Sequence, residues 1–522
     1  MDYKGDLMFE QKLDINELKK GGMVPLKEKD MFSIWVKTES CNLNSKQLRK
    51  IADITDKYAR GFLLFTSRQI PIIPFVNVAH IFDVKRELAE AEMGMDHNGP
   101  IVRNLNICYS DKICDDAVVD CIPLGEKLEK FFGSQLAHKI KIGAVGCSKD
   151  CVMSRVLNDL SLVGVDDGKG RSYESYVGGR LGINPFVGIK IADHLTENAC
   201  VNLVQNYFDL LAADGRKGER AADVIKRLSI DEFKAKLTRD LGRNATLPAV
   251  HYSTKQEREH TDTMVLKIRA ICGEVTSEQV RKIADIAEKY GNSIVHFAVR
   301  GAPEIPDASK KSLPAIRKEL AAVNLHLLDD NVENMQSCFG DYCSEGLFNP
   351  QGLLKRIEKR INELKIKDLK ITVSAAGCPS SCGIAHLSDI GFHGVMIPVV
   401  DTALCTGCGT CVAACKRKTI QVKDKKSVIE MKNCAFCGAC RSACTQKAIG
   451  EKRRGIAVLL GGRGEPGTRL GTIIAQFVSE DEAFEIADNL LQLLSKTGLD
   501  TNQLIAKMGF DAVKKAILVK AK

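Results

Sequence analysis

Residues 50–58 read KIADITDKY and residues 282–290 read KIADIAEKY, so seven of nine positions are identical at an offset of 232. The apolar residues of both stretches recur at helical spacing, and Asn44 or Ser45 can cap the first helix. The strand patterns that flank the helices return at the same offset, which a chance match between two helices would not produce. We therefore predict a tandem duplication of one unit built from strands and helices. The strand patterns are residues 32–37 and 61–68 in the first copy, and 264–268 and 293–300 in the second.

The duplication extends to a pair of cysteine motifs. Residues 146–151 read GCSKDC, and residues 377–382 read GCPSSC. Each half therefore reads as a small α/β unit followed by a larger cysteine-bearing unit, with a linker near residues 238–260. An earlier pair of cysteines belongs to each motif: Cys108 with Cys114, and Cys338 with Cys343.

Eight further cysteines lie between residues 405 and 444, in two runs of spacing C-x2-C-x2-C-x3-C. This is the spacing of a two-cluster ferredoxin, in which the fourth cysteine of each run binds the other cluster. Two interlocked runs of this kind are not a zinc pattern. The first half has no counterpart, so we predict an insertion over about residues 398–452. One [4Fe-4S] cluster is expected on Cys405, Cys408, Cys411 and Cys444, and the other on Cys434, Cys437, Cys440 and Cys415.

The bulk composition excludes several classes of protein. A chain of 522 residues that is 44% hydrophobic and 27% charged is an ordinary globular composition. A net charge of +9 is mild for this length and favours a scattered basic surface over a nucleic-acid site. No leader sequence or membrane span is expected. Twenty cysteines in short metal-type spacings indicate a reducing compartment, so we expect a cytoplasmic protein of an anaerobe.

The cysteines and the basic residues near them resemble a known family. An Arg-Asn pair, a C-x5-C pair, a Lys-x-Lys pair and a Gly-Cys-x3-Cys motif occur in this order in the siroheme-dependent sulfite and nitrite reductases. The resemblance covers nearly the whole chain from about residue 30. The inserted ferredoxin makes the chain most similar to the dissimilatory and anaerobic sulfite reductases, here with both halves in one polypeptide.

The resemblance implies an α+β fold with a duplicated architecture. Each half would contain a ferredoxin-like half-domain and a siroheme/[4Fe-4S] domain, and the second half would carry the two-cluster ferredoxin domain as an insert. The predicted boundaries are 25–95 and 260–325 for the half-domains, 96–237 for the first siroheme domain, 326–397 with 453–518 for the second, and 398–452 for the ferredoxin.

The resemblance also implies the cofactors and their ligands. Each half would hold a [4Fe-4S] cluster on four cysteines, and the last cysteine would bridge to the siroheme iron. With the ferredoxin this implies four clusters and one or two sirohemes. The Cys338-x4-Cys343 spacing is one residue shorter than the family pattern, which changes the local loop. The implied sets are Cys338, Cys343, Cys378 and bridging Cys382, and Cys108, Cys114, Cys147 and bridging Cys151.

The family binds its substrate anion with two arginines and a Lys-x-Lys pair, and the two halves differ at these positions. The first half has all four residues: Arg68, Arg103, Lys139 and Lys141. The second half has Arg300, Glu333, Lys370 and Thr372 at the matching positions.

In this family the basic residues of one half face the siroheme anchored by the other half. We therefore expect the competent site to combine the four basic residues of the first half with the cysteines of the second. In the reciprocal site Glu333 stands where Arg103 stands in the first, and its carboxylate would repel a dianion. We therefore expect the reciprocal site to have a structural role and not a catalytic one.

Two further groups of residues complete the prediction. Arg180, Arg463 and Arg469 lie in glycine-rich loops and are predicted, with Arg300, to contact the siroheme. The cysteines outside the cluster sets are expected to be small buried residues, and proton delivery is assigned to Lys139, Lys141 and ordered water. These remaining cysteines are Cys41, Cys121, Cys200 and Cys272.

The predicted function is the six-electron reduction of sulfite to sulfide, with electrons supplied by an external ferredoxin or a reductase subunit. Reduction of nitrite to ammonia is the alternative within the same machinery. Plant-type nitrite enzymes tend to have asparagine at the second lysine of the pair, so Lys141 favours sulfite. A non-catalytic electron-transfer or tetrapyrrole-binding protein is the alternative of another class, and the intact basic set of the first half argues against it. The sequence leaves open the electron donor, the oligomeric state and whether the second tetrapyrrole carries iron.

Overall fold

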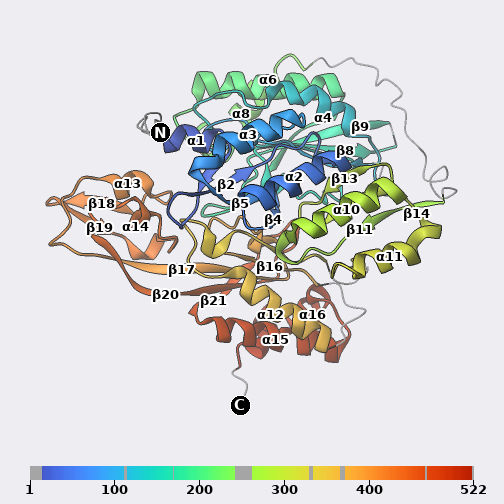
Figure 1. The fold of residues 1–522 in the computed structure, drawn as a ribbon. Helices are drawn as coiled ribbons and strands as arrows, with labels where there is room; N and C mark the ends of the chain where they lie inside the picture. Colours follow the sequence, from blue (N-terminus) through green and yellow to red (C-terminus); the bar gives the residue numbers. More distant parts are fainter. Residues whose placement is uncertain are drawn as a thin grey trace, which may run out of the picture.

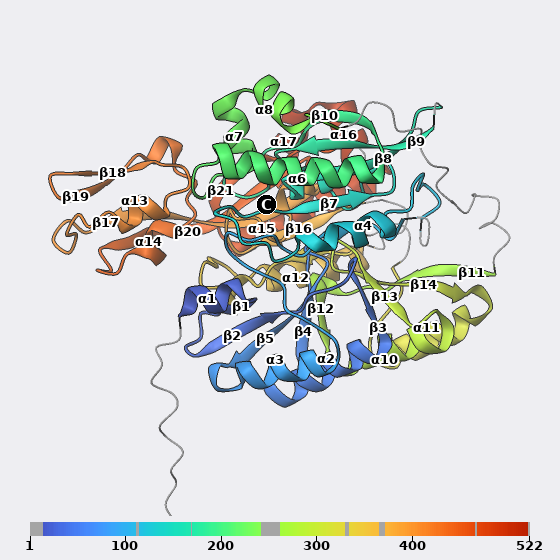
Figure 2. The same cartoon turned by 90° about the horizontal axis from the view of Figure 1, so that it is seen from above.

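The computed structural model describes residues 14–110, 114–168, 170–241, 262–328, 333–364, 371–464 and 467–519. The duplicated α+β architecture is present: two half-domain sheets, two cysteine-bearing sheets, and a small lobe that projects from one side (Figures 1 and 2). Most of the predicted linker near residues 238–260 lies outside the described residues.

The two half-domain sheets exchange one strand with each other. The first sheet contains, in order, β1 (Met23–Pro25), β2 (Met31–Trp35), β5 (Pro71–Asn77), β4 (Phe62–Phe65) and β12 (Glu274–Thr276). The second contains β11 (Thr263–Lys267), β14 (Pro303–Ser309), β13 (Ile294–Phe297) and β3 (Asn42–Asn44). The strand β12 belongs to the second half but pairs antiparallel with β4, while β3 of the first half pairs with β13. The halves are therefore tied together by backbone hydrogen bonds.

The repeated helices pack side by side across an approximate twofold axis, as expected for an isologous contact. They are α2 (Ser45–Tyr58) and α10 (Ser277–Tyr290). Arg49 on α2 lies 2.8 Å from Asp285, and the equivalent Arg281 on α10 lies 2.7 Å from Asp53. Both helices begin with a capping box, in which Asn44 and Thr276 accept a hydrogen bond from the third helical N–H. With α3 (Ile81–Glu90) and α11 (Leu313–Ala321) they cover the outer face of both sheets (Figure 2).

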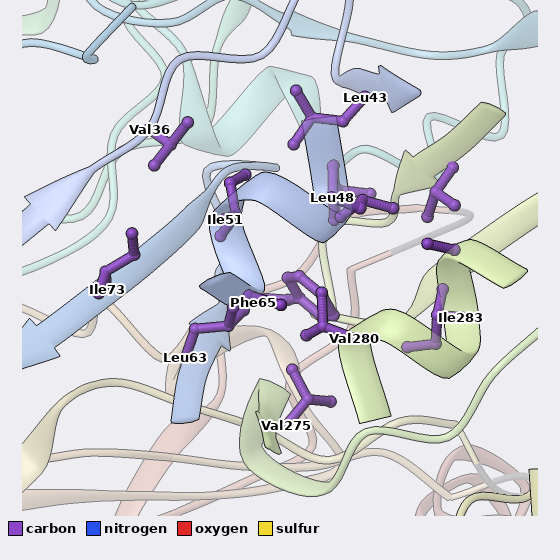
Figure 3. Packing of buried hydrophobic residues seen from close by; sticks show 14 of the residues in the cluster. Val36, Leu43, Leu48, Ile51, Leu63, Phe65, Ile73, Val275, Val280 and Ile283 are labelled. Atoms are coloured by element: carbon purple, nitrogen blue, oxygen red, sulfur yellow. The ribbon is translucent and has the colours of Figure 1, made fainter. Parts of the chain in front are cut away.

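One hydrophobic core serves both half-domains. The rings of Phe65 and Phe297, which occupy equivalent positions in the repeat, lie 4.9 Å apart. Ile51 and Leu48 of α2 and Val280 and Ile283 of α10 point into the same core (Figure 3). Each of these aliphatic side chains is fully buried, so the core favours the paired arrangement of the two halves over separate units.

Each cysteine-bearing sheet has three parallel strands followed by an antiparallel pair. The first contains β6 (Asn106–Ile107), β7 (Ile142–Val145), β8 (Leu160–Asp166), β9 (Arg171–Val177) and β10 (Ile189–Leu195). The second contains β15 (Gln336–Ser337), β16 (Val373–Ala376), β17 (Ile390–Val400), β20 (Ile449–Leu460) and β21 (Thr472–Val478). The helices of these domains are α4 (Ile122–Leu128), α5 (Ser154–Leu157), α6 (Glu197–Asp214), α7 (Ala221–Leu228) and α8 (Ile230–Leu237), with α12 (Pro350–Glu363), α15 (Glu480–Thr497), α16 (Thr501–Met508) and α17 (Phe510–Ile517).

The projecting lobe is the cysteine-rich insert. It contains α13 (Thr410–Ala414), β18 (Ile420–Lys423), β19 (Lys426–Ile429) and α14 (Ala439–Ala443), and it sits at the far end of the long β17–β20 hairpin (Figure 1). The predicted insertion began at residue 398 and ended at 452, whereas β17 continues to Val400 and β20 begins at Ile449. The difference arises because the insert extends the hairpin that β8 and β9 form in the first half.

Candidate active site

Four cysteines gather at the carboxyl ends of β15 and β16, the edge at which parallel strands present their ligands. Cys338 follows β15 and Cys378 follows β16, while Cys343 and Cys382 come from the loops that leave those positions. Burial, followed by the charges of Cys382 and Cys338, raises the pKa of the Cys378 thiol, so the thiols are near neighbours. The backbone N–H of Gly377 lies 3.1 Å from the Cys338 sulfur and donates to it.

The first half brings together the equivalent four cysteines. Cys108 follows β6 and Cys147 follows β7. A hydrogen bond with Cys151 is the main cause that lowers the pKa of Cys108. Burial raises the pKa of Cys114, and the charges of Cys108 and Cys147 add to the shift. In both sets only the last cysteine, Cys151 or Cys382, is exposed.

The insert pairs its eight cysteines crosswise. Cys405, Cys408, Cys411 and Cys444 line one small hollow. Burial and then the charges of Cys437 and Cys415 raise the pKa of Cys434, which places the fourth cysteine of the first run beside the second run. This is the arrangement that the ferredoxin spacing predicts.

Among the residues that the structure describes, no three Cys, His, Asp or Glu side chains converge closely enough to hold one ion. Zinc requires sulfur atoms about 2.3 Å from a common centre. That these cysteine sets hold [4Fe-4S] clusters stays a prediction.

The second set of the insert lies against the second cysteine-bearing domain. A cavity of about 340 Å³ is lined by both Cys437 of the insert and Cys378 of the domain, together with Lys416 and Glu345. The Met396 N–H donates to the Phe436 carbonyl at 2.8 Å, which fixes the insert on β17. The other set is the more exposed one, because Cys408 faces solvent.

The two predicted arginines of the first half lie over a single aromatic ring. Arg68 stands in the turn after β4, and its guanidinium is 5.2 Å from the Trp35 ring, while that of Arg103 is 5.9 Å away. Arg68 pairs with Asp96 at 2.9 Å, and Asp96 is fully buried. Arg103 is only 4% exposed and donates to Asn98. Within the described part of the chain, the buried Nε atoms of both arginines have no hydrogen-bond partner, so donor capacity remains for a ligand.

Lys139 and Lys141 lie beside these arginines. The charge of Arg103 and then burial lower the pKa of Lys139 well below its usual value, whereas burial and then Arg68 do so for Lys141. Among the described residues no carboxylate lies within 4.0 Å of either ammonium group. Like charges held this close in a buried site indicate a place built for an anion.

The basic residues of the first half meet the cysteines of the second half. The Ser67 hydroxyl donates to the Cys382 carbonyl at 2.8 Å. Burial is the main cause that lowers the pKa of both Arg103 and Lys141, and a negative charge on the Cys382 sulfur is a smaller, opposing influence on each. The first half thus reaches Cys382 of the second half through the Ser67 turn. That all four basic residues form one substrate site with the second cysteine set stays a prediction.

The reciprocal site is electrostatically different. Arg300 has its Nε 2.6 Å from a Glu333 carboxylate oxygen, and its Nη2 lies 3.2 Å from the Leu387 carbonyl. The Thr372 N–H and hydroxyl donate to Asp389 at 2.8 and 2.7 Å. Lys370, which matches Lys139 in the repeat, lies outside the described residues. The arginine of this site is therefore neutralised by its own chain.

The strand pair beneath each site differs as well. Trp35 stands opposite Ile72 in the first half, whereas Lys267 stands opposite Glu304 in the second. Burial raises the pKa of Glu304 and the charge of Lys267 opposes the shift. The thiolate charges of Cys151 and Cys114 in turn help to raise the pKa of Lys267, so this pair faces the first cluster set.

The arginines of the glycine-rich loops are held by their own domains. Arg180 donates to the Asn184 carbonyl at 2.6 Å and pairs with Asp223 at 2.7 Å. Arg469 donates to the Gly461 carbonyl at 2.8 Å, and its backbone pairs with Arg463. A role for these residues in siroheme binding stays a prediction. The four cysteines outside the cluster sets, Cys41, Cys121, Cys200 and Cys272, are all buried, as predicted.

Two residues of this site were not predicted. Trp35 is the only tryptophan of the chain, and its place on a strand of the first half, where the second has Lys267, was the available signal. Arg220 lies at the start of α7. Its charge contributes to the lowered pKa of Arg103, Lys139 and Lys141, and for Lys141 only burial and Arg68 contribute more to the lowering. No sequence motif marks it.

Two family models match both halves of the chain. The model for the nitrite and sulphite reductase 4Fe-4S domain matches residues 98–245 and 329–520. The model for the nitrite/sulfite reductase ferredoxin-like half domain matches residues 24–91 and 256–323.

The individual relatives have low sequence identity to this chain. A sulfite reductase [ferredoxin] of Mycobacterium tuberculosis is 22% identical over 71% of this chain and 71% of its own length. A coenzyme F420-dependent sulfite reductase of Methanocaldococcus jannaschii is 33% identical over 45% of this chain and 38% of its own length. The solved structure of the Mycobacterium tuberculosis NirA protein has the same fold, with a TM-score of 0.73 and 18% identity over 96% of this chain and 91% of that one. Among the described residues, no helix is long and apolar enough to cross a membrane.

Proposed function

Because the chain belongs to the nitrite and sulphite reductase family, we propose that it reduces sulfite to sulfide at a siroheme coupled to a [4Fe-4S] cluster. Family membership makes it an oxidoreductase with siroheme and iron–sulfur chemistry. The single observation that carries the choice of site is the contact between the Ser67 loop of the first half and Cys382 of the second.

The charge of the site supports an oxyanion substrate. Arg68, Arg103, Lys139, Lys141 and Arg220 surround it, while Asp96 and Asp159 are the carboxylates that pair with two of them. Five cations against two carboxylates leave a net positive site when all are charged. A buried net positive charge binds and polarises an anion far better than an exposed one, because solvent does not screen it.

The residues of the chain have separate roles in this proposal. Cys338, Cys343, Cys378 and Cys382 would hold the cluster, and Cys382, the exposed member of the set, would also serve as a siroheme ligand. When bound, these groups supply the electrons and the iron that takes the substrate. Arg68 and Arg103 orient the anion through charge-assisted hydrogen bonds, and Lys139 and Lys141 donate protons to its oxygens.

The insert is proposed to deliver the electrons. Cys405, Cys408, Cys411 and Cys444 would hold the cluster that an external donor reduces, because Cys408 is exposed. Cys434, Cys437, Cys440 and Cys415 would hold the next one, because Cys437 and Cys378 line the same cavity. With the set on Cys108, Cys114, Cys147 and Cys151, the proposal gives the protein four clusters. The Arg300–Glu333 pair supports a structural role for the reciprocal site.

Nitrite is the second candidate substrate, since the family includes both reductases. The five basic residues favour sulfite, because the higher charge of a dianion gains more from them than a nitrite monoanion does. The two substrates are separated by the assay below.

Purified holoenzyme supplied with reduced methyl viologen should consume six electrons per sulfite and release sulfide. The reason is that the basic site and the shared-thiolate cluster lie together. The measurement is viologen oxidation against sulfide formed, with nitrite as the comparison substrate. The same preparation should contain about sixteen irons in cubane clusters, plus those of siroheme. If protein with this cofactor content reduces neither anion, the proposal is contradicted. If it reduces nitrite faster than sulfite, nitrite becomes the preferred substrate in place of sulfite.

The pH dependence of sulfite reduction should show the loss of protons from Lys139 and Lys141. Their pKa values are lowered, so they lose their protons below the usual lysine range of about 10.4, and the neutral amines neither attract an anion nor donate as well. kcat/KM should therefore be highest below these pKa values and fall as pH rises through them. Lys141→Arg should keep the charge and move the fall to higher pH, whereas the exposed Lys149→Arg should not move it. Identical profiles for wild type and Lys141→Arg would contradict the assignment.

A further inference from the structure

We propose that Arg220 is a positioning residue of the substrate site, which holds Lys141 in place through Asp159 and adds a fifth positive charge beside the substrate anion. The inference rests on the proposed function, because it assigns a role toward the same anion. Arg220 is remote in sequence from the four basic residues that the family pattern provides.

The Arg220 guanidinium forms two hydrogen bonds with the Asp159 carboxylate. Its Nε donates to Oδ1 at 2.8 Å and its Nη2 to Oδ2 at 2.7 Å. Asp159 is fully buried, and the Arg220 side chain is 16% exposed. Such a bidentate pair fixes the orientation of both planar groups.

Asp159 in turn forms two hydrogen bonds with the backbone of Lys141, an arrangement that we call the clamp. The Lys141 N–H donates to Asp159 Oδ2 at 2.9 Å, and the Asp159 N–H donates to the Lys141 carbonyl at 2.9 Å. Lys141 directly precedes β7, so these bonds set where the strand begins and hence where the lysine side chain starts. Arg220 is thus connected to Lys141 through one intermediate residue, Asp159.

The second half shows what the same clamp looks like without the arginine. There Asp389 holds the backbone of Thr372, and the Thr372 hydroxyl makes the additional bond at 2.7 Å. The helix that corresponds to α7 is α16, and its first turn is capped by Asp500 in place of Arg220. Lys141 has no hydroxyl to make this additional bond, and in the first half Arg220 supplies the additional hydrogen bonds to the aspartate. Arg220 occurs only in the half that also has Arg103 and Lys141, which ties its charge to the anion site.

The charges around Lys141 come from several elements. Asp159 lies at the start of β8 and Arg220 at the start of α7, while Arg68 and Arg103 precede β5 and β6 and Cys382 comes from the other half. The positive charges favour the neutral amine of Lys141, and the charges of Asp159 and Cys382 favour its ammonium form. Removing Arg220 and removing the charge of Asp159 must therefore change the titration of Lys141 in opposite directions.

The test is the pH dependence of Lys141 acetylation in the holoenzyme, with acetic anhydride as the probe and peptide mass spectrometry as the readout. Arg220→Gln should move the acetylation midpoint to higher pH by about one unit, and Asp159→Asn should move it to lower pH. Arg220→Lys, which keeps the charge, should leave it nearly unchanged, as should Arg227→Gln, a variant of an outer ion pair on the same helix. In parallel, Arg220→Gln should lower kcat/KM for sulfite about tenfold, and Arg227→Gln should not.

A midpoint that does not move in Arg220→Gln would overturn the proposal, because a purely structural arginine affects folding but not the charge state of Lys141. If Arg220→Gln fails to fold, Asp159→Asn decides, and a midpoint that stays or rises would overturn the proposal. The acetylation readout does not depend on turnover. A wild-type protein that titrates as described but reduces no sulfite would contradict the proposed function and leave the role of Arg220 toward Lys141 intact.

Discussion

Arg103→Gln should lower kcat/KM for sulfite by about 10²–10³, the usual effect of removing one preorganised electrostatic donor. Arg103 is 4% exposed and lies beside Arg68 over Trp35, and its Nε has no hydrogen-bond partner among the residues that the structure describes. Glutamine keeps one amide donor but removes the charge and the fork that bind two oxygens of an anion. The measurement is steady-state kinetics with reduced methyl viologen on variants whose tetrapyrrole content has been checked by absorbance.

The matched control is Glu333→Gln, the same final residue at the equivalent position of the other half. Glu333 pairs with Arg300 at 2.6 Å and is not proposed to hold substrate, so kcat/KM should stay within about threefold of wild type. Equal losses in the two variants would indicate two working sites. No loss in Arg103→Gln, with cofactors bound, would mean that the anion binds elsewhere.

Cys382→Ser should remove sulfite turnover, whereas Cys151→Ser should retain most of it. Cys382 is the exposed member of its set and lies within reach of Arg103 and Lys141, so it is the thiolate at the basic site. Cys151 faces Lys267, whose charge is opposed by Glu304. A serine at either position should leave the two ferredoxin clusters reducible, which electron paramagnetic resonance of the reduced protein checks.

The duplication and the grouping of the ferredoxin cysteines could be predicted because residue spacing carries them, whereas the two siroheme-cluster sets were implied by the family resemblance. Cysteines separated by two, three or five residues stay close in any fold that binds a cluster. The repeat at residues 50–58 likewise predicted α2, and its counterpart α10, because an amphipathic helix with a capping residue is a local signal. The pairing of one half's basic residues with the other half's cysteines came from the family resemblance, not from spacing.

The remaining residues of the site could not be predicted from the sequence because they act through tertiary contacts. Arg220 lies 79 residues beyond Lys141, and nothing in the sequence near it differs from an ordinary helix start. Its role becomes visible only when Asp159 is seen between the two. Lys267 and Glu304 are similar: each is an ordinary charged residue until the strand register places them opposite each other beneath the first cluster set.

The composite site is tested most directly by the sulfite turnover of Cys382→Ser and Cys151→Ser, measured side by side. Both variants should be assayed with reduced methyl viologen at equal ferredoxin-cluster content. The composite site predicts background activity for Cys382→Ser and activity close to wild type for Cys151→Ser. The reverse result, a dead Cys151→Ser and an active Cys382→Ser, would contradict it, because the substrate would then be reduced at the site that contains Arg300 and Glu333.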